Sequence, residues 1–183
     1  MLAGAAGVGK TRLMLECLAV AERSGLPTAR VAATRSAAHL PFGALAPLLP
    51  PPDPHAVDAV EGQAEFLRRC CVALAERFGG RRFVIGVDDA HLLDHASATL
   101  VHHLVVNAVA FVVATVRVGE SPPDPVVALW KDDLAERLDL TGLTSESIEE
   151  LLGTVLDGSL DRAAVARLAL RCQGNVLYLR ELV

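Results

Sequence analysis

A glycine-rich motif near the start of the chain is the feature that most constrains its fold. Residues 4–11 read GAAGVGKT, a full match to the pattern G-x-x-x-x-G-K-[ST]. In this pattern the glycines let backbone N–H groups turn inward around a phosphate, the lysine reaches the outer phosphates and the hydroxyl can ligand Mg²⁺. A helix predicted directly after the loop, over 11–24, has a positive dipole end that favours an anion there. The alternative interpretation is a flexible turn that carries an accidental Lys-Thr pair.

Strands and helices are predicted to alternate after this loop, which is typical of an α/β sheet with crossover helices. The apolar run at 83–87, for example, indicates a strand that is buried on both faces in a parallel sheet. The predicted order is strand 28–34, a short apolar helix that begins at Pro41, helix 61–78, strand 83–87, helix 92–107, strand 110–116, helix 126–131 and strand 136–140. The run Pro50-Pro51-Pro52 is interpreted as a surface loop or a rigid connector.

The sequence changes character at about residue 141, where only helices are predicted. Thr144 or Ser145 can cap a helix with an acidic first turn, and a second helix over 161–172 ends before Gly174-Asn175. A last helix begins near Val176. We therefore expect a P-loop α/β core over 1–140 and a small all-helical appendage over 141–183.

Composition excludes several classes of protein. The 183 residues are 52% hydrophobic and 21% charged, with a net charge of −5, so the chain is globular and has no basic patch for nucleic acid. Aromatic residues make up 4%, too few for a base-stacking surface. There is no secretory signal pattern and no apolar run of about 18 residues, so we expect a soluble, cytoplasmic protein. The four cysteines form no C-x-x-C pair and are predicted to be buried thiols.

Two adjacent carboxylates follow the buried strand at 83–87. Ligands bind at the carboxyl ends of strands in open α/β sheets, so Asp88 and Asp89 are placed at a candidate site. Asp88 is the expected Mg²⁺ ligand, together with Thr11, and Asp89 the expected catalytic group that orients or deprotonates an attacking water. The alternative is an Asp-Asp turn that only ends the strand.

Other polar side chains near this strand carry weaker predictions. Arg117 ends the next strand along the chain, where it can stabilise a γ-phosphate or be a surface cation. His91 can contact the phosphates, relay a hydrogen bond or be a structural histidine, and the sequence leaves these roles open. The remaining histidines of this region are predicted to lie on a solvated helix: His95, His102 and His103.

Five segments in a fixed order resemble one family. They are GVGKTRLM, LPFGALAPLLP, FVIGVDDAHLLD, VVATVRVGE and GNVLYLREL. Together they are similar to the ATPase module of large LuxR-type transcriptional regulators, which belong to the STAND class of AAA-like NTPases. The resemblance covers nearly the whole chain.

The resemblance implies a site, cofactors and partners. It assigns Asp88 and Asp89 to the Walker B pair and Arg117 to a sensor-1 position, and it makes the helices over 141–183 the start of a helical lid subdomain. It implies ATP and Mg²⁺ as cofactors, slow ATP hydrolysis, self-association in the ATP state, and contact with DNA only through a separate C-terminal helix-turn-helix domain. No membrane partner is expected. The phosphate loop and nucleotide would be held by seven residues, namely Gly4, Gly7, Val8, Gly9, Lys10, Thr11 and Arg12.

Departures from the family pattern keep alternatives open. Only Met1-Leu2-Ala3 precede Gly4, where the family has a longer central strand, so we expect a truncated first strand and a weaker anchor for the loop. Val176 stands where the lid motif has Pro, and no helix-turn-helix follows. The chain is therefore expected to be a fragment that lacks the DNA-binding domain. The alternatives are another P-loop NTPase, such as a small-molecule kinase or a nucleic-acid motor, or a fragment deficient in nucleotide binding.

Overall fold

The chain folds around a parallel sheet of five strands in the order β2-β3-β4-β1-β5. The computed structural model describes residues 1–49, 60–155 and 161–182. The strands are β1 (Leu2–Gly4), β2 (Thr28–Ala32), β3 (Phe83–Asp88), β4 (Ala110–Arg117) and β5 (Leu138–Leu140). The Pro50-Pro51-Pro52 run lies outside the described residues.

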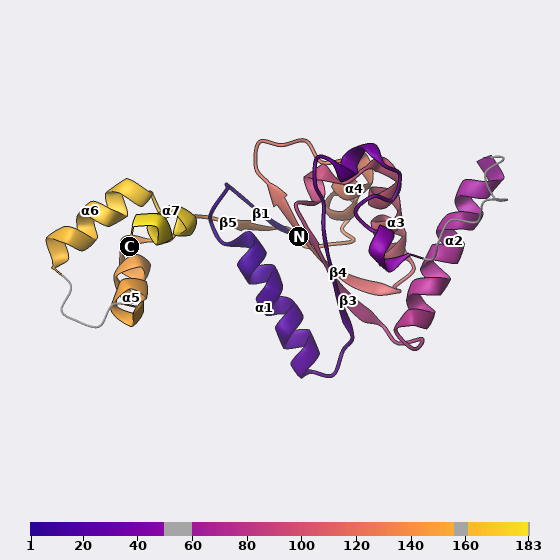
Figure 1. Cartoon of the computed structure of the whole chain (residues 1–183), viewed down its shortest axis with the longest axis horizontal. Helices are drawn as coiled ribbons and strands as arrows, with labels where there is room; N and C mark the ends of the chain where they lie inside the picture. Colours follow the sequence, from indigo (N-terminus) through magenta and orange to yellow (C-terminus); the bar gives the residue numbers. More distant parts are fainter. Residues whose placement is uncertain (50–59, 156–160, 183) are drawn as a thin grey trace.

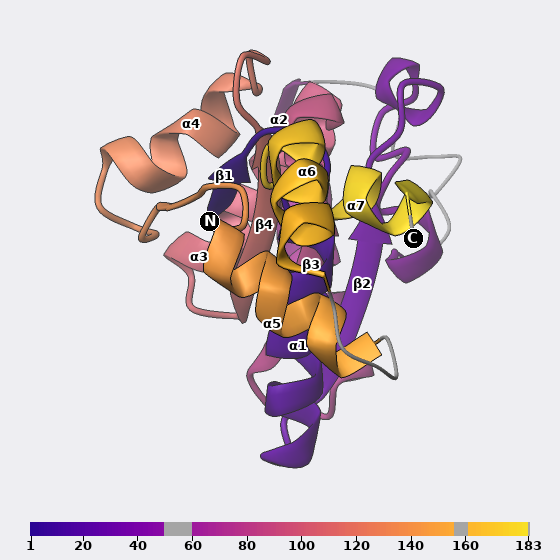
Figure 2. The ribbon, with the colours of Figure 1, turned by 90° about the vertical axis from the view of Figure 1, so that its left-hand side faces the viewer.

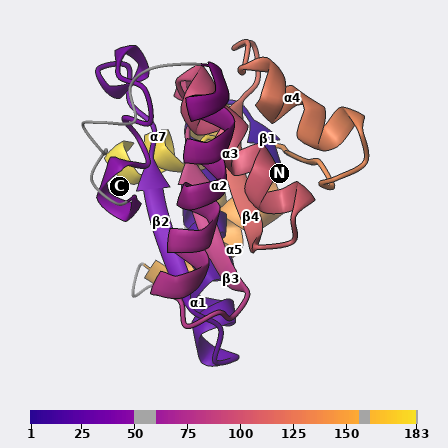
Figure 3. The ribbon, with the colours of Figure 1, turned by 90° about the vertical axis from the view of Figure 1, so that its right-hand side faces the viewer.

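Helices cover both faces of this sheet (Figure 1). Helix α1 packs against β1, β2, β3 and β4 on one face. In Figure 3, α2 passes in front of β3 on the opposite face, beside α3. The helices of the α/β part are α1 (Lys10–Arg23), α2 (Val60–Arg77), α3 (His95–Val106) and α4 (Asp124–Lys131). The predicted α/β architecture, with a mostly parallel sheet flanked by helices, is confirmed.

The first strand is short, as expected, but it does not lose its pairing partners. Leu2, Ala3 and Gly4 pair in parallel with β4 on one side and with β5 on the other. Leu2 and Ala3 are buried. Three residues therefore suffice to place the start of the phosphate loop at the centre of the sheet, and the expected weakening of its anchor is not seen.

The segment between β2 and α2 differs from its prediction. Instead of one apolar helix from Pro41, two 3₁₀ helices flank a turn, η1 (Ala37–His39) and η2 (Ala46–Leu48). Phe42 adopts a left-handed backbone with φ 59°, and its N–H donates to Asp94 Oδ1 at 3.0 Å. Asp94 also caps α3 by accepting from the Ser97 N–H at 2.9 Å. One buried carboxylate therefore ties this turn to the start of α3.

Three helices form a separate unit after β5, α5 (Ser145–Val155), α6 (Arg162–Cys172) and α7 (Val176–Leu182). They gather on the side of the molecule that Figure 2 shows in front, beyond α1. Their own cluster of apolar side chains is distinct from the clusters that flank the sheet: Ile148, Leu152, Val165, Cys172 and Leu179. The helical lid predicted from residue 141 stays a prediction as a domain, but its helices are present.

Candidate functional site

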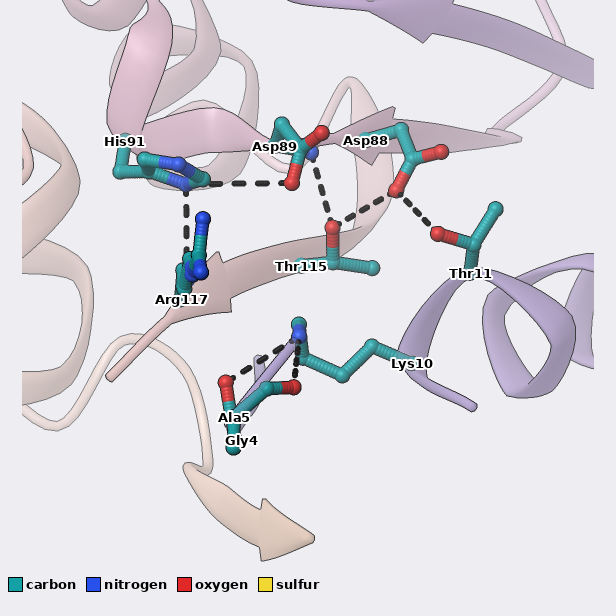
Figure 4. A network of polar contacts seen from close by, with 9 residues as sticks. All are labelled: Gly4, Ala5, Lys10, Thr11, Asp88, Asp89, His91, Thr115 and Arg117. Atoms are coloured by element: carbon teal, nitrogen blue, oxygen red, sulfur yellow. Dashed lines mark hydrogen bonds and ion pairs between the residues drawn. The ribbon is translucent and has the colours of Figure 1, made fainter. Parts of the chain in front are cut away.

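The phosphate loop joins β1 to α1, and the side chain of Lys10 donates hydrogen bonds to carbonyls within the loop. Gly7 and Gly9 have φ angles of 79° and 97°, which L side chains rarely adopt. Lys10 is 8% exposed, and its Nζ donates to the carbonyls of Gly4 at 3.1 Å and Ala5 at 2.7 Å (Figure 4). Burial lowers the pKa of Lys10, which the charges of Asp89 and Asp88 oppose and that of Arg117 reinforces.

Asp88 ends β3 and is the centre of a buried hydrogen-bond network. Its Oδ1 accepts from the hydroxyls of Thr11 at 2.9 Å and Thr115 at 2.8 Å. Its Oδ2 lies 3.3 Å from the Arg30 guanidinium on β2. Thr11 and Asp88 are 77 residues apart in the chain. The structure therefore brings together the hydroxyl and the carboxylate that the sequence assigned to a metal ion.

Thr115 connects both acidic residues. Its hydroxyl oxygen accepts from the Asp89 N–H at 2.8 Å while it donates to Asp88. The Asp89 backbone is left-handed, with φ 52°, a conformation that aspartate tolerates better than most residues. The Asp89 side chain remains half exposed. Thr115 is fully buried, and the Asp88 carboxylate that it holds is buried too, whereas the Asp89 side chain lines the adjoining cavity.

His91 and Arg117 lie beside Asp89 at the ends of neighbouring strands (Figure 4). The Arg117 N–H points at His91 Nδ1 at 3.4 Å, and the same nitrogen lies 4.0 Å from Asp89 Oδ1. The His91 side chain is 6% exposed. His91 is thus buried at the cavity wall, next to the backbone N–H of Arg117 and the carboxylate of Asp89.

A cavity of about 480 Å³ lies over the phosphate loop. Its walls come from the carboxyl ends of β3 and β4, from the loop and from α7. The charged side chains that line it comprise four cations and two carboxylates: Lys10, Arg35, Arg117, Arg180, Asp89 and Glu120. This excess of positive charge suits a polyanion.

Not all of the predicted nucleotide-binding residues line this cavity. Gly7, Gly9, Lys10 and Thr11 do, whereas Gly4, Val8 and Arg12 do not. Gly4 lies where a Cβ would come within 2.7 Å of the Leu140 carbonyl, so its role is close packing of β1 on β5. The Arg12 guanidinium is exposed and pairs with Glu16 one turn along α1.

The residues present fit a magnesium ion. Mg²⁺ in phosphate-loop sites takes a Ser/Thr hydroxyl and an acidic oxygen, and Thr11 Oγ1 and Asp88 Oδ1 already lie 2.9 Å apart. Among residues 1–49, 60–155 and 161–182, no group of three His, Cys, Asp or Glu side chains is arranged to hold a metal. His95 and His103 are exposed on α3 and His102 is half-buried.

Several residues of the site were not predicted from the sequence. Thr115 is a polar residue in the apolar strand AFVVATVR, a signal that could have been used. Arg30 gives no such signal, because its contact depends on the register of β2 against β3, which places Ala32 beside Asp88. Arg35, Glu120 and Arg180 reach the cavity from three separate segments.

The fold and this arrangement define the class: the chain has the fold of the P-loop NTPases. Solved structures with the same fold include the RuvB Holliday junction branch migration motor of Thermotoga maritima, at a TM-score of 0.60 and 19% identity, over 99% of this chain and 51% of that one. DnaA of Aquifex aeolicus, solved with AMPPCP bound, matches with a TM-score of 0.61 and 14% identity, over 98% of this chain and 52% of that one. ORC1 of Aeropyrum pernix, solved in complex with DNA, matches with a TM-score of 0.59 and 19% identity, over 97% of this chain and 50% of that one.

These three proteins are P-loop NTPases of the AAA+ type. The chain spans about half the length of each of them. No protein-family model matches the sequence, and no curated protein matches it either. Within the part of the chain that the structure describes, no helix has the length and apolar character to cross a membrane.

Proposed function

We propose that the chain is an ATP-binding module that hydrolyses ATP slowly and acts as a nucleotide switch. The observation that carries the proposal is the pairing of Thr11 with Asp88 at the edge of a cavity with four cationic side chains. A phosphate loop, a strand-end carboxylate and an excess of cations are what an Mg-nucleoside triphosphate requires. The AMPPCP-bound DnaA structure shares this fold, which supports the same class of ligand here.

Each residue has a role that follows from its position. Lys10 would leave the loop carbonyls and pair with the outer phosphates, where its charge is compensated. Thr11 and Asp88 would hold Mg²⁺, which supplies charge neutralisation when bound. Asp89 faces the cavity and would accept a proton from the attacking water, while Arg117 would stabilise charge on the γ-phosphate. His91 would hold the Arg117 backbone and the Asp89 side chain in fixed positions relative to each other.

The place of this module in a LuxR-type transcriptional regulator is part of the same proposal. Three contacts in the structure join the sequence segments of the resemblance. The Phe42 N–H donates to Asp94, the Arg117 N–H points at His91, and the Leu177 N–H donates to the Gly7 carbonyl. Four of the five segments contribute residues to the wall of the cavity, and the Phe42–Asp94 contact ties the fifth to one of them. This arrangement is expected if the segments work as a unit. DNA contact and self-association would involve surfaces beyond this site.

Binding of a fluorescent ATP analogue tests the proposal. Titrations with and without Mg²⁺ should show saturable binding to the parent chain and at least a tenfold loss in Lys10→Met, which keeps the length of the side chain but removes its charge. Lys131→Met is the matched control, because Lys131 is exposed at the end of α4. Equal binding by the parent and Lys10→Met would overturn the proposal.

A second candidate is a nucleic-acid motor, which the likeness to the RuvB motor favours. The net charge of −5 opposes it, because strand binding needs basic grooves. Measured phosphate release separates the two: a switch hydrolyses ATP slowly whether or not DNA is present, whereas a motor is accelerated by single- or double-stranded DNA.

A further inference from the structure

Asn175 joins the helical unit to the phosphate loop, 169 residues away in sequence. It lies directly before α7, and its Nδ2 donates to the Ala6 carbonyl at 3.1 Å. The Leu177 N–H donates to the Gly7 carbonyl at 3.3 Å. Two consecutive loop carbonyls are thus bonded by donors from the start of α7.

The two sides of this contact are built to fit. A Cβ on Gly7 would overlap the Asn175 side chain, so only glycine leaves room for it. Asn175 Oδ1 accepts from the Tyr178 N–H at 3.1 Å and so caps α7. The turn before it is fixed as well, because the Gly174 carbonyl accepts from the Leu143 N–H at 2.9 Å. Asn175 therefore reaches the loop from a rigid support.

The contact has a consequence for the other side of the loop. In a trans peptide unit the C=O and the following N–H point in opposite directions. Donors that hold the Ala6 and Gly7 carbonyls toward α7 therefore turn the N–H groups of Gly7 and Val8 away from α7. Backbone N–H groups are the parts of such a loop that bind phosphate oxygens.

We propose that Asn175 is a positioning residue that orients the backbone N–H groups of the phosphate loop for a nucleotide's phosphates. The inference rests on the proposed function and deepens it, since it assigns loop geometry to a residue outside the loop. It also links the two parts of the chain: if α7 raises the affinity of the loop for nucleotide, nucleotide strengthens the docking of α7 by the same factor.

Two substitutions separate this role from the cap. Asn175→Ser and Asn175→Asp each keep a side-chain oxygen that can cap α7, but neither offers the Nδ2 donor to Ala6. The Ser variant should bind the fluorescent ATP analogue about three- to tenfold more weakly than the parent, the usual effect of one neutral hydrogen bond. The Asp variant should bind more weakly still, because its carboxylate faces a carbonyl and repels phosphate.

Two further readouts distinguish positioning from general destabilisation. The thermal midpoint of the Ser variant without nucleotide should stay close to that of the parent, because its hydroxyl can still cap α7. Turnover at saturating ATP should be unchanged while KM rises. Tyr178→Ala is the control, because this exposed side chain lies on α7 and does not line the cavity. It should bind the analogue like the parent.

Each outcome has a definite meaning. Parental affinity in both Asn175 variants overturns the positioning role, and so does a loss of affinity in the Ser variant that is matched by a fall in its nucleotide-free midpoint. If the parent chain and Lys10→Met bind the analogue equally, the proposed function fails and this inference falls with it. Lys10-dependent binding that is insensitive to Asn175 refutes the inference alone.

Discussion

Lys10 is a cation held in a nearly buried position by two carbonyls, and its titration offers a test at the scale of one residue. Burial lowers its pKa in the folded chain below that in the unfolded chain, against the pull of Asp89 and Asp88 and with the help of Arg117. The charged lysine thus costs stability at neutral pH, and this cost fades as pH rises through the folded pKa, where the unfolded chain binds more protons.

The pH dependence of Lys10→Met should show this. The free energy of unfolding of the variant, minus that of the parent, should be largest at neutral pH. This difference should fall as pH rises from 7 toward 10, because the parent then loses the cost of its charged lysine. Urea unfolding of both chains at several pH values measures the difference. Lys131→Met, a change at an exposed position, should show no such trend. A difference that is independent of pH would contradict the lowered pKa.

Thr115 gives a second prediction at this scale, because one hydroxyl serves both Asp88 and the Asp89 N–H. Thr115→Val keeps the shape but leaves a buried carboxylate and a backbone N–H short of a partner, so it should cost about 1–3 kcal/mol of stability. Thr115→Ser keeps the hydroxyl and should cost less. Urea unfolding provides the comparison, and equal losses in the two variants would mean that only packing matters at this position.

Motif residues were predictable one by one, while their partners were not. Lys10, Thr11 and Asp88 follow from local patterns, since each pattern states its own chemistry. The contacts of Arg30 and Thr115 with Asp88 depend on how β2 and β4 align with β3, and hydrophobic runs do not encode register between parallel strands. Asn175 depends on the path of the whole helical unit, which no local pattern specifies.

At the scale of elements, the close approach of α1 to β3 can be tested at one glycine. A Cβ on Gly86 would lie 2.9 Å from Leu18 Cδ1 and 3.1 Å from Met14 Sδ, both on α1. Gly86→Val should therefore overpack this contact and cost about 1–3 kcal/mol.

Gly153 on α5 provides the matched opposite case, because a Cβ there meets nothing within 4 Å. Gly153→Ala should stabilise the helix by about 0.5–1 kcal/mol, through the lower flexibility of the unfolded chain. Thermal unfolding of the two variants and the parent shows whether Gly86→Val loses stability and Gly153→Ala gains it. A tolerated Gly86→Val would show that α1 shifts readily on the sheet.

Strongly patterned elements were predicted well, and the exceptions have local causes. The strand at 83–88 is buried along its length, so its apolar run left little ambiguity. The apolar stretch from Pro41 was wrongly predicted as a helix, because the left-handed Phe42 and the distant Asp94 hold it as a turn. The first strand was expected to anchor poorly, but pairing on both sides compensates for its three residues.

At the scale of the whole molecule, the apolar side chains fall into clusters that flank the sheet and one that joins α5, α6 and α7. Polar contacts link the helical unit to the phosphate loop, chiefly through Asn175 and the Leu177 N–H. Because few apolar contacts cross this boundary, we expect the helical unit to open without unfolding of the sheet.

Ile148→Ala tests whether the helical unit after residue 140 opens independently of the sheet. Ile148 is 1% exposed within the helical cluster, so the change should cost about 2–5 kcal/mol locally. Amide hydrogen exchange should then speed up across α5, α6 and α7 while protection in β3 and β4 stays at the parental level. Leu104→Ala, in the cluster beside the sheet, is the matched control and should accelerate exchange in β3 and β4. Equal acceleration in both parts by Ile148→Ala would mean that the chain unfolds as one cooperative unit, and that Asn175 lies inside a single domain and not at a joint between two.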